Sequence, residues 1–178
     1  MRILGIDPGS IVTGYGVIEL SANTETAVDY GCIHAKADDW PTRLKLIYDG
    51  ITTVVDRCQP DEVAIETPFV HRNASSALKL GQARAAALCA VFAVAGGVAE
   101  YAPRAVKLAV VGTGAATKDQ VQHMIKALLK LNEAPQADAA DALAIALCHS
   151  HGRRARGLLA AGGTAVALQR RGSRRRWR

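Results

Sequence analysis

The chain has 178 residues, of which 49% are hydrophobic and 21% are charged. This length suits one domain with a sizeable core, and no segment approaches the roughly 20 apolar residues of a membrane span. The formal net charge of +6 is unevenly distributed: residues 1–151 hold all 16 acidic residues and 13 of the 22 Lys and Arg, whereas residues 152–178 hold nine Arg and no acid. Because Met1 and Arg2 lead directly into the first predicted strand, we expect a cytoplasmic protein without a signal peptide.

The predicted elements are strands first and helices afterwards. Residues 2–7, about 14–20 and about 26–34 have strand patterns separated by turn residues, which indicates an antiparallel meander. The later elements are a helix from Pro41 to about Gln59, a strand over 62–66, a helix over about 74–95, a strand over 98–101, and helices over about 103–110, 117–131 and 136–150. This order predicts an α/β protein with a ribonuclease H-like fold, in which a five-stranded mixed sheet has helices on both faces.

The end of the chain differs in composition from the rest. We predict a folded domain over residues 1–151 and an arginine-rich, flexible tail over 152–178, with His149 and His151 completing the C-terminus of the last helix. Basic tails bind phosphate backbones without reading sequence, so the tail is either a nonspecific DNA contact or a solvated appendage.

Four acidic residues lie at the ends of apolar elements, where a role in keeping the surface soluble does not explain them. Asp7 and Glu66 each end a short apolar strand, and Asp138 and Asp141 open an alanine-rich helix. The spacing of the helical pair places both carboxylates on one helix face. In the predicted sheet the two strands are parallel neighbours, so Asp7 and Glu66 meet at one edge and the last helix brings its acids over them. For each helical acid the alternative is complementation of the helix dipole.

Four converging carboxylates would raise one another's pKa, and hard divalent cations relieve that conflict. We therefore expect a site for Mg²⁺, with two ions per subunit and Mn²⁺ able to substitute, that acts on phosphates. Two ions about 3.5–4 Å apart can activate a water, neutralise the transition state and stabilise the leaving oxygen. Asp7, on the central strand, is the best candidate to bridge both ions.

Basic and aromatic residues near the predicted site suggest contacts with DNA. Lys107 and Lys118 flank a glycine-containing turn, and Lys118 lies near a helix start, where phosphates are favoured. Phe69 and Arg72 stand in the loop after the strand that ends at Glu66. The aromatic side chain is either a plug of the core or a wedge that stacks on an unpaired base. The alternative for both lysines is an ordinary solvated surface position.

The predicted helix over 74–95 is apolar around most of its circumference, which is not expected of a helix that has one solvent-exposed side. Its second face meets either another copy of the chain or the C-terminal helices of the same subunit. A two-fold dimer would place two equivalent sites on one face, as symmetric cutting of two strands requires.

Five motifs follow one another between residues 2 and 150. They are Gly5-Ile6-Asp7-Pro8-Gly9, Thr13-Gly14-Tyr15-Gly16, Ala64-Ile65-Glu66, Ser76-Ala77-Leu78-Lys79-Leu80-Gly81-Gln82-Ala83-Arg84 and Gln136-Ala137-Asp138-Ala139-Ala140-Asp141-Ala142-Leu143-Ala144. Together, in this order and at these separations, they resemble the RuvC family of bacterial Holliday-junction resolvases. The resemblance implies a homodimeric, Mg²⁺-dependent endodeoxyribonuclease that binds four-way junctions and nicks two opposed strands symmetrically, in homologous recombination and DNA repair. It also implies partnership with the RuvA–RuvB branch-migration complex, and roles for Lys107 and Lys118 in DNA binding and at the cleavage centre.

Two other functions remain open. One is a catalytically silent junction-binding protein, in which the acids only shape the fold. The other is an actin-like ATPase, because Asp7, Ser10 and Thr13 also resemble the first phosphate loop of actin-like sugar kinases. Such ATPases need two domains of this kind and an adenosine motif, whereas this chain shows one phosphate-loop motif. A nuclease assay that compares Mg²⁺ with EDTA separates the silent protein from the enzyme.

Overall fold

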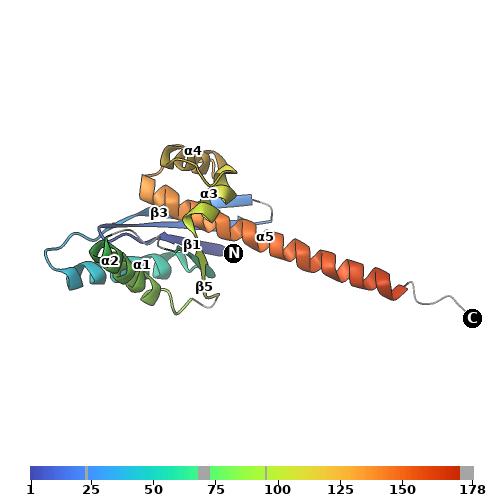
Figure 1. Ribbon diagram of the computed structural model, residues 1–178, viewed down its shortest axis with the longest axis horizontal. Coiled ribbons are helices and arrows are strands. Elements are labelled where there is room, and N and C mark those ends of the chain that lie inside the picture. Colours follow the sequence, from blue (N-terminus) through green and yellow to red (C-terminus); the bar gives the residue numbers. More distant parts are fainter. Residues whose placement is uncertain (23, 68–72, 95, 173–178) are drawn as a thin grey trace, which may run out of the picture.

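The computed structural model describes residues 1–22, 24–67, 73–94 and 96–172, with side chains described as far as Arg156. Its centre is a five-stranded sheet with the strand order β3-β2-β1-β4-β5 (Figure 1). The strands are β1 (Arg2–Asp7), β2 (Val12–Ser21), β3 (Thr24–His34), β4 (Glu62–Glu66) and β5 (Val98–Tyr101). The first three strands pair antiparallel, and β4 pairs parallel to both β1 and β5. The predicted mixed sheet is confirmed.

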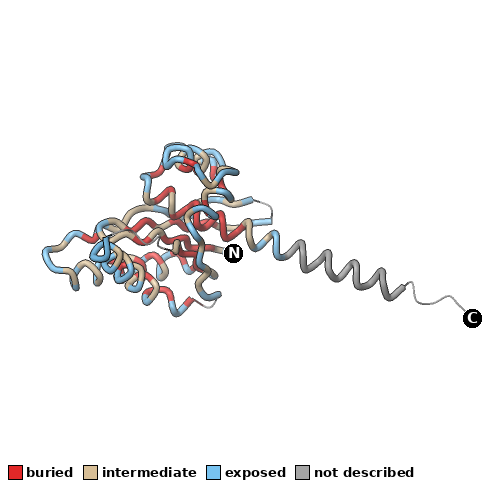
Figure 2. The backbone as a smooth tube through the Cα atoms, in the orientation of Figure 1, coloured by how far each residue is buried: buried red, intermediate tan, exposed pale blue. Residues whose placement is uncertain are grey.

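Helices cover both faces of this sheet, as predicted (Figure 1). They are α1 (Trp40–Cys58), α2 (Ala74–Cys89), α3 (Pro103–Val111), α4 (Lys118–Leu128) and α5 (Ala137–Gly172). The pair α1 and α2 packs on one face, and α3, α4 and α5 pack on the other. Figure 2 shows the buried backbone gathered along the strands and the adjoining part of α5.

The residues of β1 divide between the two faces with the period of two that a strand imposes. Leu4 and Ile6 are fully buried in the apolar cluster under α1 and α2, whereas Ile3 belongs to the cluster under α5. Gly5 and Asp7 therefore share the face that carries α5. The same alternation in the sequence that builds the core also directs the carboxylate of Asp7 toward that helix.

The short strand β4 follows the same pattern. Val63 and Ile65 are buried under α1 and α2, and Ala64 is buried under α5. Because side chains alternate, Glu62 and Glu66 must both lie on the α5 face, at opposite ends of the strand.

Two glycines allow α5 to approach the sheet closely. A Cβ atom added to Gly14 would lie 2.0 Å from the carbonyl oxygen of Asp138, and one added to Gly5 would lie 2.1 Å from that of Ala142. A side chain at either position would collide with the helix backbone, so both positions need the one residue that has no Cβ. This contact holds the first turns of α5 beside the end of β1, where Asp7 lies.

The helix α2 ends at Cys89, so the predicted end near residue 95 was wrong. After it, the amide of Val91 donates to the carbonyl of Leu88, and the amide of Val94 donates to that of Val91. These tight turns bury both valines in the core under α1 and α2. Helical periodicity continues through this segment, but burial of the valines determines its backbone conformation.

The helix α5 continues to Gly172, past the end near residue 150 that the sequence predicts. The segment contains no proline, and its many Ala, Leu and Arg residues have high helix propensity. His149, expected at a helix end, is therefore an interior helical residue and is buried. Within the described part of the chain, no helix combines the length and the apolar character needed to cross a membrane.

Substituting Gly14 by Ala should lower the free energy of unfolding by roughly 1–3 kcal/mol, because the added methyl group collides with backbone that cannot move aside as a side chain could. The matched control is Gly81 in α2, where an added Cβ meets no atom of the described residues within 4 Å. Gly81→Ala should raise the free energy of unfolding by roughly 0.5–1 kcal/mol. Urea unfolding measures both effects, and a neutral Gly14→Ala substitution would contradict the close approach of α5.

Candidate active site

The four predicted carboxylates come from three elements that meet at one edge of the sheet. Asp7 is the last residue of β1, Glu66 is the last residue of the parallel neighbour β4, and Asp138 and Asp141 lie in the first turns of α5. One carboxylate oxygen from each of Asp7, Asp138 and Asp141 lies within 4.8 Å of the other two. The spacing of three residues in α5 thus places both helical acids beside Asp7, as predicted.

Glu66 lies outside that trio but lines the same cavity as Asp7 and Asp141. The cavity has a volume of about 310 Å³ and is lined by Asp7, Pro8, Glu66, Leu80, Pro103, Val106, Lys107, Lys118, Val121 and Asp141. Residues from α2, α3 and α4 therefore complete a wall around the acids. The structure brings oxygens of three carboxylates within 4.8 Å of one another and places the fourth carboxylate at the cavity that Asp7 and Asp141 line.

The cluster is electrostatically strained. Burial raises the pKa of Asp7 to about 7, and the carboxylates of Glu66, Asp141 and Asp138 add to this shift. Burial also raises the pKa of Glu66 to about 7, with a further contribution from Asp141. The pKa of Asp141 is raised by burial too, although the nearby Lys118 opposes the shift. Near neutral pH, full ionisation of this cluster requires additional positive charge.

Both predicted lysines lie at the cavity. Lys118 is the first residue of α4, and its Nζ atom lies 3.2 Å from the Asp141 Oδ2 atom, which raises the pKa of the ammonium group. The helix start is fixed by a capping box between Thr117 and Gln120. Lys107 reaches the cavity from α3. The two lysines offset part of the carboxylate charge and add cationic groups where a phosphate would enter.

A buried threonine shapes the turn that follows Asp7. The Thr13 hydroxyl donates to the Gly9 carbonyl oxygen at 3.0 Å and accepts from the Gly9 amide at 3.3 Å. The sequence identified Thr13 only as part of motifs, and not as the residue that holds this turn. Its role is visible only in the structure, where its side chain is fully buried near the start of β2.

Other neighbours of the site could not be identified from the sequence. Leu80, Val106 and Val121 form apolar parts of the cavity wall. Cys32 lies on β3. Burial raises the pKa of its thiol, and the nearby carboxylate of Asp138 adds to this shift. Helical and strand periodicity marks such residues as inward-facing but does not reveal which of them border a cavity.

Phe69 and Arg72, predicted to contact DNA, lie outside the described residues.

Comparisons with known proteins identify relatives over nearly the whole chain. The family model described as crossover junction endodeoxyribonuclease RuvC matches residues 3–149. The chain is 59% identical over 149 residues to the crossover junction endodeoxyribonuclease RuvC of Yersinia pestis, which covers 84% of this chain and 86% of the relative. It is 55% identical over 163 residues to that of Shewanella loihica, with coverage of 92% and 93%. The solved structure of Thermus thermophilus RuvC in complex with a Holliday junction substrate is similar, with a TM-score of 0.79, 35% sequence identity and coverage of 86% of this chain and 95% of that chain.

The substitution Asp7→Asn should raise the free energy of unfolding at pH 8 in EDTA by roughly 1–3 kcal/mol. The folded-state pKa of Asp7 is about 7, above the 3.8 of an ordinary aspartate, so the folded protein retains a proton that the unfolded chain releases. Wild-type stability therefore falls as the pH rises from about 4 to about 7, and a neutral amide removes that loss. Below about pH 4 the advantage of the variant should vanish, because both states are then protonated.

Urea unfolding at pH 4, 6 and 8 measures this difference. The control is Asp56→Asn, which changes an exposed acid of α1 and should show no such pH-dependent gain. If Asp7→Asn is no more stable than the wild type at pH 8, the charge of Asp7 is already compensated in the folded chain.

Proposed function

The chain belongs to the family of the crossover junction endodeoxyribonuclease RuvC, and we propose that it resolves four-way (Holliday) DNA junctions in homologous recombination and repair by nicking two opposed strands symmetrically. The observation that carries this proposal is the carboxylate cluster at the edge of a ribonuclease H-like sheet, where oxygens of Asp7, Asp138 and Asp141 lie within 4.8 Å of one another. Such a cluster suits metal-dependent hydrolysis of a phosphodiester.

Asp7, Glu66, Asp138 and Asp141 are proposed to hold Mg²⁺, with two ions per subunit and Mn²⁺ able to substitute. The donors are all carboxylate oxygens, which hard divalent cations prefer. The raised pKa values of Asp7 and Glu66, both about 7, support this assignment because a cation would compensate charge that the folded chain leaves unbalanced. When bound, such an ion supplies a water of lowered pKa and neutralises charge that develops on the phosphate.

The residues around the acids are proposed to bind and orient the DNA. Lys118 is the first residue of α4, and its ammonium group pairs with Asp141. A phosphate at this helix N-terminus would therefore meet both the lysine side chain and the positive end of the α4 dipole. Lys107 approaches the same cavity from α3. Phe69 and Arg72 are proposed as further DNA contacts on sequence grounds alone.

Two alternatives find less support. The loop of an actin-like ATPase would need its hydroxyl groups to face a phosphate, whereas the Thr13 hydroxyl is fully buried and bonded to Gly9. A silent junction-binding protein would retain buried, mutually repelling acids at a cost in stability and without a chemical use.

The exposed face of α2 supports a homodimer. Ala83 and Ala87 are buried on the side that packs against α1, whereas Leu78 is 64% exposed and Phe92, just after the helix, is 72% exposed. The alternative expectation, that the C-terminal helices of the same subunit cover α2, is wrong because α2 and α5 lie on opposite faces of the sheet. A second copy of the chain is the proposed partner of this face, and the RuvA–RuvB complex is a further proposed partner.

The substitution Asp7→Asn should abolish Mg²⁺-dependent cleavage of a synthetic four-way junction, with a rate at least about a hundredfold lower, because an amide keeps the shape but loses the charge that binds the cation. Junction affinity in EDTA should be unchanged or higher, since one negative charge is removed near phosphates. Gel assays of nicking and binding measure both quantities.

Asp56→Asn serves as the control in this assay and should cut at the wild-type rate, with linear duplex as the control substrate. Nicking by Asp7→Asn at the wild-type rate would remove Asp7 from the site and leave the proposed function without its main support.

The substitution Leu78→Glu should convert the dimer to a monomer and abolish paired nicking of opposed strands, while the fold persists because the side chain is largely exposed. The matched control is Leu108→Glu on α3, which changes a leucine that is 57% exposed on the other side of the sheet and should leave the dimer intact. Analytical ultracentrifugation measures the assembly state. A wild-type monomer, or a Leu78→Glu variant that remains dimeric, would contradict this role of α2.

A further inference from the structure

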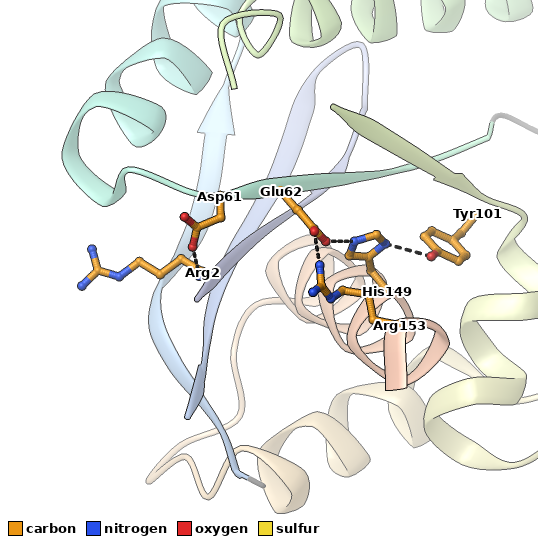
Figure 3. Close-up of polar contacts among 6 residues, drawn as sticks. All are labelled: Arg2, Asp61, Glu62, Tyr101, His149 and Arg153. Carbon is orange, nitrogen blue, oxygen red and sulfur yellow. Dashed lines mark hydrogen bonds and ion pairs between the residues drawn. The ribbon is translucent and has the colours of Figure 1, made fainter. Parts of the chain in front are cut away.

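His149 is a buried residue of α5 that the carboxylate cluster does not include. It is 5% exposed, and both nitrogens of its ring have partners. The Nε2 atom lies 2.6 Å from the Glu62 Oε2 atom, and the Nδ1 atom lies 2.8 Å from the Tyr101 hydroxyl (Figure 3). A neutral imidazole satisfies both bonds at once, because Nε2–H donates to the acid and Nδ1 accepts from the hydroxyl. We call Glu62, Tyr101 and His149 the polar anchor, which joins α5 to β4 and β5.

The polar anchor lies at the end of the sheet opposite the acid cluster. Glu62 is the first residue of β4, whereas Glu66 is the last. From Asp141 to His149 the helix rises roughly 12 Å, so the anchor is too far away to touch the carboxylate oxygens of the cluster. Any influence of the anchor on their arrangement must therefore pass through the position of α5.

The same part of α5 is also held from the other side of the sheet. The Ser150 hydroxyl donates to the Glu25 Oε1 atom at 2.8 Å, and the Arg154 Nη1 atom lies 3.1 Å from that oxygen. Arg153 pairs with Glu62. Because Glu25 is on β3 and Glu62 is on β4, the strands β2 and β1 lie between these two acids. The polar contacts therefore hold the helix on both sides of the central strands.

The apolar packing of α5 defines its distance from the sheet better than its position along the sheet. Ala142 and Ala146 lie over Gly5, and Leu143 lies over Gly16. Small side chains against bare backbone allow a close approach, but the hydrophobic effect is non-directional and changes little as such surfaces slide. A hydrogen bond, in contrast, weakens steeply away from its preferred distance and angle. The polar contacts are thus the more sensitive to a shift of the helix along its axis.

We propose that the polar anchor is a positioning group for the carboxylate cluster: it fixes the axial register of α5 and thereby sets the separation of Asp138 and Asp141 from Asp7. In coiled coils a buried polar residue fixes the register of helices at a cost in stability, and the same physics applies here. The inference rests on the proposed function, in which these carboxylates hold a divalent cation. The anchor itself has no contact with that cation.

The test measures Mn²⁺ binding to the full chain without DNA by electron paramagnetic resonance, with Asp7→Asn as the reference that lacks the site. A triple variant, Glu62→Leu with Tyr101→Phe and His149→Leu, exchanges the anchor for apolar side chains. Replacing a buried polar pair in this way is often neutral for stability, so the melting temperature should change little. The dissociation constant for Mn²⁺ should nevertheless rise by about tenfold or more. The Mg²⁺ concentration that half-saturates junction cleavage should rise by a similar factor.

Three single variants separate positioning from other roles. Glu62→Gln removes the negative charge but keeps an oxygen that accepts from His149, so Mn²⁺ binding should stay at the wild-type level. Tyr101→Phe removes one of the two bonds to the ring and should raise the dissociation constant by about threefold. Val54→Ala opens a cavity in the core on the other face of the sheet and should lower the melting temperature without weakening Mn²⁺ binding.

Wild-type Mn²⁺ affinity in Tyr101→Phe and in the triple variant would overturn the proposal, and Tyr101→Phe alone decides this if the triple variant does not fold. Equal losses of affinity in Val54→Ala would assign the anchor to general stability, and a loss in Glu62→Gln would assign it to long-range electrostatics. A wild-type chain that binds no Mn²⁺ would overturn the inference together with the metal site. A chain that binds Mn²⁺ through Asp7 but cuts no four-way junction would contradict the proposed function alone.

Discussion

The candidate site depends on the close contact between α5 and the sheet. Asp7 lies on the α5 face because of the alternation along β1, and the helical acids reach it only because Gly5 and Gly14 present bare backbone to the helix. A single methyl group at either glycine would occupy the space of a helix carbonyl and force the two layers apart. These glycines carry no chemical group, yet the distance between the carboxylates rests on them as much as on the acids themselves.

Two regions of α5 show opposite uses of buried charge: its first turns, and residues 149–154 in its middle. Beside the first turns, Asp7 and Glu66 have pKa values near 7 because burial and neighbouring carboxylates oppose ionisation, and Lys118 offsets only part of that conflict. Beside residues 149–154, Glu62 and Glu25 each meet cationic or hydrogen-bonding partners from the helix. The charge of carboxylates that are already paired is compensated within the fold, whereas carboxylates left in conflict are available to bind a cation. This contrast distinguishes the candidate metal site from an ordinary structural ion pair.

The sequence predicted the features that follow from local pattern and chain order. Alternation and apolar runs identified all five strands, and the parallel crossover placed Asp7 beside Glu66. The end of α2 could not be predicted, because burial of Val91 overrides a helical pattern that continues past it. The interior position of His149 was also missed, since its partner Glu62 is distant in sequence and only the packed helix brings them together. Local pattern thus located the acids, but the contacts that hold them at their separations are tertiary.

The register of α5 connects the active site to the contacts that Glu25 and Glu62 make with residues 149–154 of this helix. From Glu62 to Glu66, β4 rises roughly 13 Å, and from Asp141 to His149, α5 rises roughly 12 Å. The helix therefore presents Asp141 near Glu66 and His149 beside Glu62 at the same time. A shift of one residue along the helix would turn every side chain by about 100° and break both sets of contacts together. Because a helix in a packed core moves as a rigid body, the polar contacts of Glu25 and Glu62 with α5 also hold the register that the carboxylate cluster requires.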